Sequence, residues 1–490
     1  MLIKPFLLIW ALTALALIAQ PAAWSDPRLV FAHYVVWNAD YGKSIDGDPV
    51  KGYMRDIQEA QAAGIDGFAL DLGAWSSRPY YIPNVDNMFE AAARLNTGFH
   101  LFYSADFASR ELTAADVRAV LRRYLDNPRW APYYFRYHGR PVLSTFSGDL
   151  EAGVGAENVT WWKNNLIDPL RAGTEPGDQP KTGLTPIDPF VLPTFFVRAK
   201  GAPEVPVYED VLNAPRSSYN AWWGQVVDGL YYWGIAGIPQ SPYVDSRGAN
   251  QSTITSSQAY ARVAHENGKL YIGLCAPQFW QCKGKTVQRR YYEYQGGIGM
   301  RAKWMSIIQV EKPELVEVVT WNDFYEATYW SPIDDPVKTG GVHAPLGFFK
   351  SHAGALELLK YYIQWYKTGH QPAIHRDTIY WFYRTHPKDA VAPNDPDGPV
   401  KGLYGPVADD IYVTCNLTAP AVLTVNTGGH TQSIDVPAGS TDVAVPFNPG
   451  SQAFILTRHG RTVLQGAGDP IDQTIQIYNF NYSTGFAQGN

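Results

Sequence analysis

Two carboxylates, Asp323 and Glu326, stand three residues apart directly after a short β-branched run at residues 316–320. An amide and several aromatic rings share the stretch with them, which is VEVVTWNDFYEATYW over residues 316–330. Glycoside hydrolysis commonly uses two carboxyl groups, one protonating the leaving oxygen and one acting as a base on water or as a nucleophile. The stretch therefore predicts a sugar-cleaving site, provided that the rest of the chain supplies a scaffold to position it.

Strand-like runs alternate with helix-like runs over about 340 residues, which predicts that scaffold. The expected strands are residues 28–37, 65–72, 99–104, 141–146, 190–197, 226–233, 269–274 and 315–320. The expected helices are residues 52–63, 87–95, 113–125, 159–170, 208–212, 256–267, 285–309 and 353–366. Eight β-then-α units favour an α/β fold of the (β/α)₈ (TIM barrel) type. The rival, an open doubly wound sheet, normally has a Gly-rich phosphate turn after its first strand, where this chain has WNAD at residues 37–40.

The sequence pattern changes after His370, where Gly, Pro, Asn and Asp separate short strand-like runs. These runs are residues 378–384, 410–414, 421–426, 432–436, 442–445, 452–458 and 474–480. They predict a C-terminal antiparallel β-sandwich domain. We therefore expect a signal peptide at residues 1–23, a catalytic barrel at 24–372 and an accessory sandwich at 373–490. We expect the sandwich to brace the barrel, because its aromatic residues fall inside strand runs.

Composition narrows the class of partner. The net charge of −6 and the absence of a basic stripe argue against a nucleic-acid binder. Aromatic residues make up 14% of the chain, with 16 Trp and 31 Tyr, and their flat faces suit stacking on sugar rings. The N-terminus resembles a secretory signal, with Lys4 before an apolar run at residues 6–19. We expect a secreted or periplasmic monomer that acts on a polysaccharide, without a membrane partner once the signal is cleaved.

Three cysteines are too few for a disulfide framework. Cys275 and Cys282 are close enough in sequence to pair in an oxidising compartment, which would leave Cys415 over. No CxxC motif or His/Cys cluster is present, so neither a metal nor a cofactor is expected.

Catalytic groups in a barrel collect at the carboxyl ends of the strands. Asp71 lies between Leu70 and Leu72 and faces either into the barrel or outward, whereas Asp66 favours a structural role in the turn before the strand. His33, on an apolar strand, has a core role as its alternative. Tyr103, Asp106 and Asp149 stand at further strand ends without an assigned role. The candidate catalytic residues are Asp323, Glu326 and Asp71, and the candidate substrate-binding residues are Trp37, Asn38, His33, Tyr231, Trp233, Trp280, Trp321, Asn322 and Tyr325.

Several of these stretches carry a resemblance. VFAHYVVWN near the first strand, DIQEAQAAGIDGFALDLG across the second and VEVVTWNDFYEATYW at the eighth are similar to glycoside hydrolase family 71. The tail segments DIYVTCNLTAPAVLTVN, IDVPAGSTDVAVPFNPG and IYNFNYSTG resemble the end of that family. The resemblance implies an endo-acting α-1,3-glucanase (mutanase) on a (β/α)₈ barrel with a C-terminal β-domain. It also implies inversion of configuration.

In that family the essential Asp and Glu occur in a W-N-D-x-x-E motif, which maps onto Asp323 and Glu326. A further essential Asp is expected nearer the N-terminus, mapped onto Asp71 or Asp66. Two positions depart from the family pattern: Tyr325 replaces a usual Gly, and Asp71 replaces a usual Asn. The stretch GLCAPQFW at residues 273–280 matches only loosely.

The sequence thus predicts a secreted, endo-acting glycosidase that cleaves α-1,3-glucan with two carboxylates. It leaves open which of Asp323 and Glu326 is the acid. One alternative is a barrel glycosidase that acts on another α-linked glycan in the manner of an endo-mannosidase. The other is a non-catalytic glycan-binding protein.

Overall fold

The structure is a computed structural model that describes residues 27–38, 45–109, 111–147, 161–177, 180–194, 227–235, 237–239, 252–282, 289–333, 349–400 and 402–489. The expected signal peptide at residues 1–23, the expected helix at 208–212 and Asp149 lie outside these residues. Among the described helices, none combines the length and the apolar character that crossing a bilayer requires.

The larger part of the protein is an α/β fold built on a curled sheet. Within the described residues, eight strands pair in parallel in the order β6–β5–β3–β2–β1–β11–β8–β7. Their bounds are β1 Leu29–Val35, β2 Gly67–Leu72, β3 His100–Asp106, β5 Arg140–Phe146, β6 Phe190–Pro193, β7 Gly229–Tyr231, β8 Leu270–Cys275 and β11 Leu315–Val318. A short antiparallel strand, β4 (Arg136–Tyr137), pairs with the start of β5. Side chains along β1, β2 and β11 are almost all buried, as expected for parallel strands covered on both faces.

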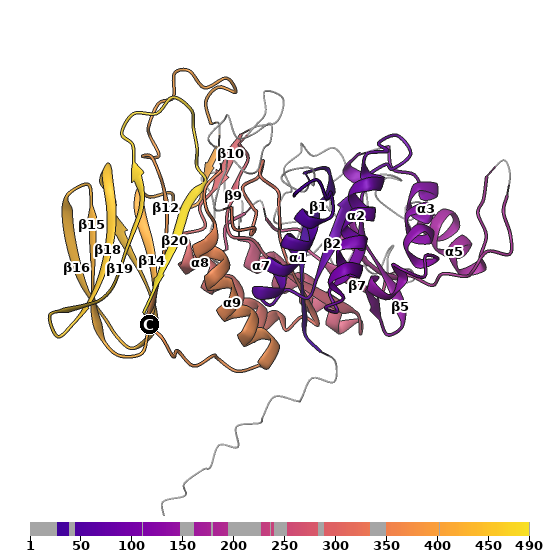
Figure 1. Cartoon of the computed structure of the whole chain (residues 1–490), viewed down its shortest axis with the longest axis horizontal. Helices are drawn as coiled ribbons and strands as arrows, with labels where there is room; N and C mark the ends of the chain where they lie inside the picture. The colour runs from indigo at the N-terminus through magenta and orange to yellow at the C-terminus, as the bar shows by residue number, and fades with distance from the viewer. Residues whose placement is uncertain are drawn as a thin grey trace, which may run out of the picture.

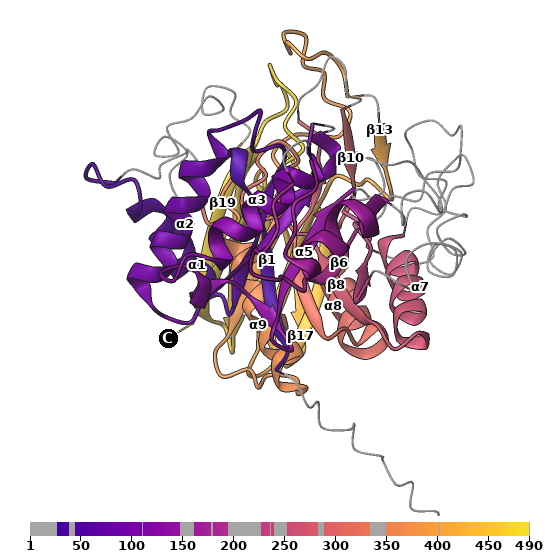
Figure 2. The same cartoon turned by 90° about the vertical axis from the view of Figure 1, so that its right-hand side faces the viewer.

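Helices follow these strands and lie around the outside of the sheet (Figure 2). They are α1 Lys51–Ala62, α2 Tyr81–Leu95, α3 Ala114–Leu125, α5 Asp168–Ala172, α7 Thr253–Glu266, α8 Gly297–Met305 and α9 Ala353–Thr368. A π-helical stretch, Lys163–Ile167, leads into α5, and another, Ser306–Glu311, extends α8. Short 3₁₀ turns lie at Val36–Asn38, Phe107–Ser109 and Ala131–Tyr133. The start of α3 is fixed by a capping box, in which Thr113 and Asp116 satisfy each other's backbone N–H groups.

Two antiparallel sheets follow α9 and pack face to face. One has the order β17–β14–β12–β20 and the other β16–β15–β18–β19. Their strands are β12 Thr378–Arg384, β14 Asp410–Leu417, β15 Ala421–Thr427, β16 His430–Val436, β17 Gly439–Pro446, β18 Gly450–Arg458, β19 Arg461–Ile471 and β20 Tyr482–Gln488. The rings of Trp381 and Phe454 stack between the sheets with centroids 4.6 Å apart. These aromatic side chains therefore fill a core and do not face solvent.

Helices α8 and α9 lie between the C-terminal sheets and the remainder of the parallel sheet (Figure 1). The approach is close: a Cβ placed on Gly354 in α9 would lie 2.4 Å from the carbonyl oxygen of Gly485 in β20. A third, small sheet adds to this side of the molecule, where β10 (Arg290–Tyr292) pairs with β9 (Phe279–Trp280) and β13 (Gly402–Tyr404).

Two expected elements are wrong. The expected long helix at 285–309 begins only at Gly297, because Arg290–Tyr292 pairs as β10 with two other strands. The expected strand at 474–480 is irregular, since its backbone N–H groups bond to side chains: Tyr478 donates to Asp395 and Asn479 to His386. The pattern also failed to predict β19 and β20 as strands.

Candidate active site

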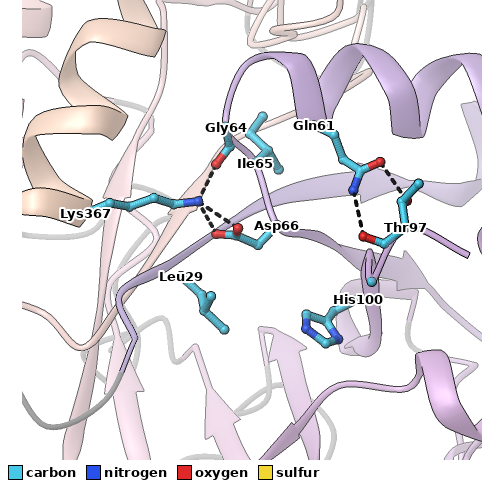
Figure 3. A pocket seen from close by; sticks show the side chains of 9 residues that line it. Leu29, Gln61, Gly64, Ile65, Asp66, Thr97, His100 and Lys367 are labelled. Carbon is cyan, nitrogen blue, oxygen red and sulfur yellow. Dashed lines mark hydrogen bonds and ion pairs between the residues drawn. The ribbon is translucent and has the colours of Figure 1, made fainter.

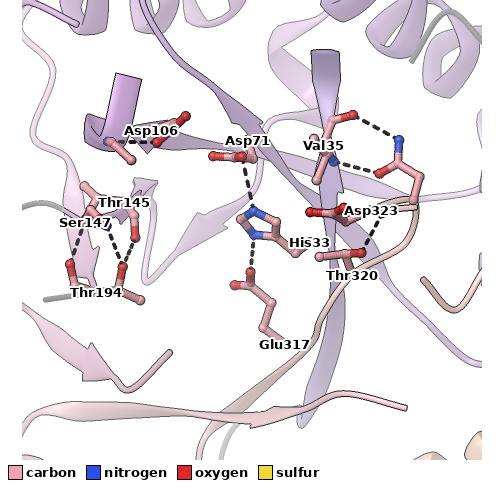
Figure 4. Close-up of polar contacts among 12 residues, drawn as sticks. His33, Val35, Asp71, Asp106, Thr145, Ser147, Thr194, Glu317, Thr320 and Asp323 are labelled. Carbon is pink, nitrogen blue, oxygen red and sulfur yellow. Dashed lines mark hydrogen bonds and ion pairs between the residues drawn. The ribbon is translucent and has the colours of Figure 1, made fainter. Parts of the chain in front are cut away.

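His33, Asp71 and Glu317 form a buried row at the carboxyl ends of three adjacent strands (Figure 4). Nδ1 of His33 lies 2.7 Å from Oε1 of Glu317, and Nε2 lies 3.6 Å from Oδ2 of Asp71. Burial alone would lower the pKa of His33, but the hydrogen bonds and charges of Asp71 and Glu317 outweigh it and raise the pKa to about 10. The ring is therefore an imidazolium between two carboxylates at neutral pH.

The ion pair has a consequence for Asp71. Its Oδ1 atom is buried and has no hydrogen-bond partner among the described residues, while Oδ2 faces His33. An unpartnered buried carboxylate oxygen is costly unless a ligand or water satisfies it. The sequence left two directions open for the side chain of Asp71. In the structure this side chain points toward His33. His33 itself is 2% exposed, and both of its ring nitrogens face carboxyl groups, an arrangement that orients Asp71. Direct contact of His33 with substrate stays a prediction.

The loop at residues 319–330 leaves β11 and folds back on itself. Backbone bonds join Thr320 to Thr328 and Trp330 to Thr320, each at 2.8 Å. Thr320 Oγ1 accepts the N–H of Asp323 at 2.7 Å. Oδ1 of Asp323 in turn accepts the N–H groups of Tyr325 at 2.9 Å and Glu326 at 3.0 Å. The loop therefore fixes Asp323 through three hydrogen bonds and places Glu326 beside it.

The carboxyl groups of Asp323 and Glu326 differ in their pKa values. Burial raises the pKa of Asp323 to about 6, although the N–H donors of Glu326 and Tyr325 and the charge of His33 oppose the rise. Burial and then the charge of Asp323 raise the pKa of Glu326 to about 8, with Arg290 opposing. The pair therefore titrates in two steps, and Glu326 holds its proton to a higher pH than Asp323 does. An environment that separates the pKa values of two neighbouring carboxyls creates an acid and a base.

Asp106 is a further carboxyl group near this row, at the end of β3. Burial raises its pKa to about 7, and the charge of Asp71 adds to the shift. Its Oδ1 accepts the N–H of Ala108 at 2.9 Å. The sequence predicted Asp106 at a strand end but assigned it no role. Because β3 pairs with β2, the order of the strands could have predicted that Asp106 lies near Asp71.

Asn322 holds the loop on β1. Its Oδ1 accepts the N–H of Val35 at 2.8 Å and its Nδ2 donates to the carbonyl of Val35 at 2.9 Å. The N–H of Trp321 also donates to the carbonyl of His33 at 2.6 Å. Asn322 therefore holds the loop against β1 through both atoms of its amide, and its contact with substrate stays a prediction.

The expected stacking rings divide into two groups. Trp37 is 38% exposed, and its ring centroid lies 5.2 Å from that of the partly exposed Tyr325, so this pair is open to a ligand. Trp233 is partly exposed, with its ring edge-on to His33 at 4.6 Å. Trp280 and Trp321 are completely buried, Trp280 against Phe480, so neither ring is open to a ligand in this structure, and their stacking on sugar stays a prediction. The backbones of Asn38 and Tyr231 lie in a 3₁₀ turn and in β7, and their side chains are outside the described part of the structure.

Asp66 lies at the opposite, amino-terminal end of the strands (Figure 3). Oδ2 accepts the N–H of Val30 at 2.8 Å, and the Nζ of Lys367 donates to Oδ1 at 2.7 Å. The surrounding pocket, which His100 and Gln61 also line, measures about 320 Å³. Asp66 therefore ties α9 to the start of β1, in agreement with the structural role that its sequence context favoured.

None of the three cysteines forms a disulfide bond in the structure, and all three are buried. The pairing of Cys275 with Cys282, which the sequence left open, is absent from the structure. The Cys282 N–H instead donates to the carbonyl of Tyr325 at 2.8 Å, which supports the 319–330 loop from the side of β9.

The chain is similar in sequence to curated proteins and in fold to solved structures. The glucan endo-1,3-alpha-glucosidase agn1 of Schizosaccharomyces pombe is 28% identical over 461 residues, covering 94% of each chain. A mutanase of Penicillium rubens is 28% identical over 493 residues, covering 98% of this chain and 93% of its own. A GH99 endo-alpha-mannosidase structure from Bacteroides thetaiotaomicron aligns with a TM-score of 0.45 at 14% identity, over 69% of this chain and 97% of that one.

The family comparison also covers most of the chain. The family model described as "Glycosyl hydrolase family 71" matches residues 26–167 and 197–490. These residues include β1, β2, the 319–330 loop and both C-terminal sheets. The chain is a glycoside hydrolase and belongs to glycosyl hydrolase family 71.

Proposed function

We propose that this enzyme hydrolyses α-1,3-glucan by endo action, with Glu326 as the general acid and Asp323 as the general base. The observation that carries the assignment is the pKa order on one loop, about 8 for Glu326 and about 6 for Asp323. A protonated Glu326 donates to the leaving glycosidic oxygen, while ionised Asp323 takes a proton from the attacking water. The names of the two relatives supply the substrate class.

Asp71 acts with this pair as the third carboxylate. Its negative charge contributes to the raised pKa of Asp323, and its unpartnered Oδ1 is a free acceptor for a sugar hydroxyl or for the attacking water. Nε2 of His33, 3.6 Å from Oδ2, places a positive charge beside Asp71. Trp37 and Tyr325 supply the aromatic face on which a glucose ring stacks.

Asp323→Asn and Glu326→Gln test the assignment, with release of reducing ends from α-1,3-glucan as the readout. Both variants keep the shape of the wild-type side chain, so loss of activity without loss of far-UV circular dichroism reports on chemistry. We expect losses of at least about 10²-fold for each. Anomer analysis of the first product by NMR tests inversion, and a panel of α-linked glycans tests the linkage. Preferred cleavage of another linkage would reassign the substrate and keep the acid and base.

We also propose that the eight parallel strands form a complete (β/α)₈ barrel. The N–H of Asp228, next to β7, donates to the carbonyl of Val191 in β6 at 2.9 Å, and Asp228 Oδ2 accepts the Val191 N–H at the same distance. These bonds support closure between the two edges of the curled sheet. The end of α9 at Thr368 and the start of β12 at Thr378 support a domain boundary near residue 373.

For localisation, we propose that residues 1–23 are a cleaved signal peptide and that the enzyme acts outside the cytoplasm. The name of one relative, the ascus wall endo-1,3-alpha-glucanase of Schizosaccharomyces pombe, supports action at a wall, outside the cytoplasm. N-terminal sequencing of the protein recovered from the medium or periplasm tests it. A recovered chain that still starts at Met1 would contradict cleavage.

A further inference from the structure

The segment that precedes β20 reaches from the C-terminal sheets to the 319–330 loop. Asn481 is 1% exposed and stands in this segment, directly before Tyr482. Its Nδ2 donates to Oη of Tyr329 at 2.8 Å, and its Oδ1 accepts the amide of Gln278. Tyr329 belongs to the loop that carries Asp323 and Glu326, so one side chain connects the C-terminal sheets to that loop.

Gln278 completes the connection, and its orientation is determined by its neighbours. Its Oε1 accepts the N–H of Tyr482 at 2.9 Å, which leaves Nε2 to donate to the carbonyl of Ala327 at 2.9 Å. Because Nε2 of Gln278 must donate, the atom of Asn481 that faces it is the acceptor Oδ1. Ala327 follows Glu326 and has a positive φ of 51°, a conformation that a non-glycine residue adopts at a cost. The hydrogen bond from the Gln278 side-chain amide to the Ala327 carbonyl therefore holds the loop at its residue with the least favourable backbone conformation.

His352, just before α9, adds a third contact. Its ring stacks on Tyr329 with centroids 3.8 Å apart. Its Nδ1 lies 2.6 Å from the carbonyl of Tyr329, and its Nε2 lies 2.8 Å from Oδ1 of Asn481. Burial lowers the pKa of His352 to about 4, so the neutral ring has one N–H to share between two acceptors. The same loop residue is thus held by its ring, its carbonyl and its hydroxyl.

We propose that Asn481 is a positioning residue that fixes the 319–330 loop from the C-terminal sheets, so that these sheets complete the active site. This inference rests on the proposed roles of Asp323 and Glu326. All four side chains of the network, Gln278, Tyr329, His352 and Asn481, are buried. A buried polar network whose members bond to one another specifies one arrangement, and removal of one member leaves its partners unsatisfied.

Asn481→Leu tests the proposal, because leucine has a similar size and cannot bond to Gln278 or Tyr329. The matched control is Thr484→Val, which removes a hydrogen bond of 2.9 Å from β20 to the carbonyl of Ser351 but leaves the 319–330 loop untouched. We expect kcat of Asn481→Leu on α-1,3-glucan oligosaccharides to fall about 10- to 100-fold with little change in KM, since the loop carboxyls lose their alignment. We expect Thr484→Val to keep the wild-type kcat.

A second readout separates positioning from general destabilisation. Hydrogen exchange of peptides spanning residues 319–330 should be faster in Asn481→Leu than in the wild type and unchanged in Thr484→Val. Wild-type kcat and wild-type exchange in a folded Asn481→Leu enzyme would overturn the proposal. If that variant does not fold, Tyr329→Phe decides, because it keeps the ring stack on His352 and loses the hydroxyl that Asn481 contacts. Wild-type kcat in Tyr329→Phe would then overturn the proposal.

The exchange experiment also distinguishes the two proposals. Retained activity in both Asp323→Asn and Glu326→Gln would remove the catalytic assignment, while faster exchange in Asn481→Leu would still show that the C-terminal sheets hold the loop. Loss of activity in the carboxyl variants with unaltered exchange in Asn481→Leu would keep the catalytic assignment and remove the positioning role.

Discussion

The Nε2 atom of His33 lies 3.6 Å from Oδ2 of Asp71, and the other ring nitrogen bonds to Glu317, which is 284 residues away in the sequence. A buried cation thereby stands among several acidic side chains, including three that we propose for catalysis. The charge of His33 lowers the pKa of Asp323, of Glu326 and of Asp106 relative to the values that burial would otherwise give. This relationship underlies the first two predictions.

His33→Gln should destabilise the folded enzyme by about 3–5 kcal/mol at neutral pH, because it leaves two buried carboxylates without their cation. The effect depends on pH with a defined sign. The pKa of His33 is raised from 6.5 to about 10 on folding, so its stabilising contribution is complete below pH 6.5 and is lost as the pH rises through 10. Urea denaturation of both proteins at pH 6, 8 and 10 should show a difference that narrows with pH. A constant or widening difference would contradict the assignment of His33 as an imidazolium.

The dependence of kcat/KM on pH should be bell-shaped with its maximum between about pH 6 and pH 8. The lower limb reports ionisation of the base, whose pKa burial raises to about 6, and the upper limb reports loss of the acidic proton at about 8. Because Asp323 and Glu326 interact, the two limbs belong to the pair. Initial rates on soluble α-1,3-glucan oligosaccharides provide the measurement. A maximum below pH 5 would show that both carboxyls are ionised at neutral pH, against the proposed roles.

Asp66→Asn and Asp71→Asn should have different effects, although both residues come from the same short segment. Asp66 bonds to Lys367 at the amino-terminal end of the strands, so its replacement should cost about 1 kcal/mol of stability and leave kcat unchanged. Asp71→Asn should lower kcat by at least about 10²-fold, because it removes a carboxylate beside the reacting groups. Kinetics and thermal unfolding of the two variants measure both effects. A large loss of kcat in Asp66→Asn would contradict the assignment of Asp71, and not Asp66, as the third catalytic carboxylate.

Tyr325→Gly should weaken substrate binding more than it slows chemistry. The ring forms half of the exposed pair with Trp37, and an aromatic contact contributes about 0.5–1.5 kcal/mol, so KM should rise roughly 2- to 12-fold. Phe486→Ala is the control, since this ring is as exposed as that of Trp37 but belongs to β20. Unchanged KM in Tyr325→Gly would exclude the Trp37–Tyr325 pair as a sugar-stacking surface.

Periodicity and turn residues predicted much of the fold. The parallel strands were expected within a few residues of their observed bounds, because buried β-branched runs and helical spacing are local properties of the chain. The position of Asp323 and Glu326 after the eighth of these strands followed from the same pattern. The failures at 285–309 and 474–480 share a cause, since there the backbone bonds to distant partners that no local pattern contains.

The site was less predictable than the scaffold. The bond between His33 and Glu317 depends on the register of β1 against β11, in which Phe31 stands opposite Glu317, and sequence spacing does not give that register. Composition likewise could not separate the exposed Trp37 from the buried Trp280, because the burial of Trp280 comes from Phe480 in the C-terminal part of the chain. Asn322 was expected to touch substrate because it adjoins Asp323, whereas its amide matches the backbone of Val35.

The most direct test of the central claim is reducing-end release from α-1,3-glucan by the wild-type enzyme, Asp323→Asn and Glu326→Gln, measured side by side at the wild-type pH optimum. The proposed mechanism predicts release by the wild type and a loss of at least about 10²-fold in each folded variant. Release at the wild-type rate by either folded variant would contradict the claim that Asp323 and Glu326 are the base and the acid.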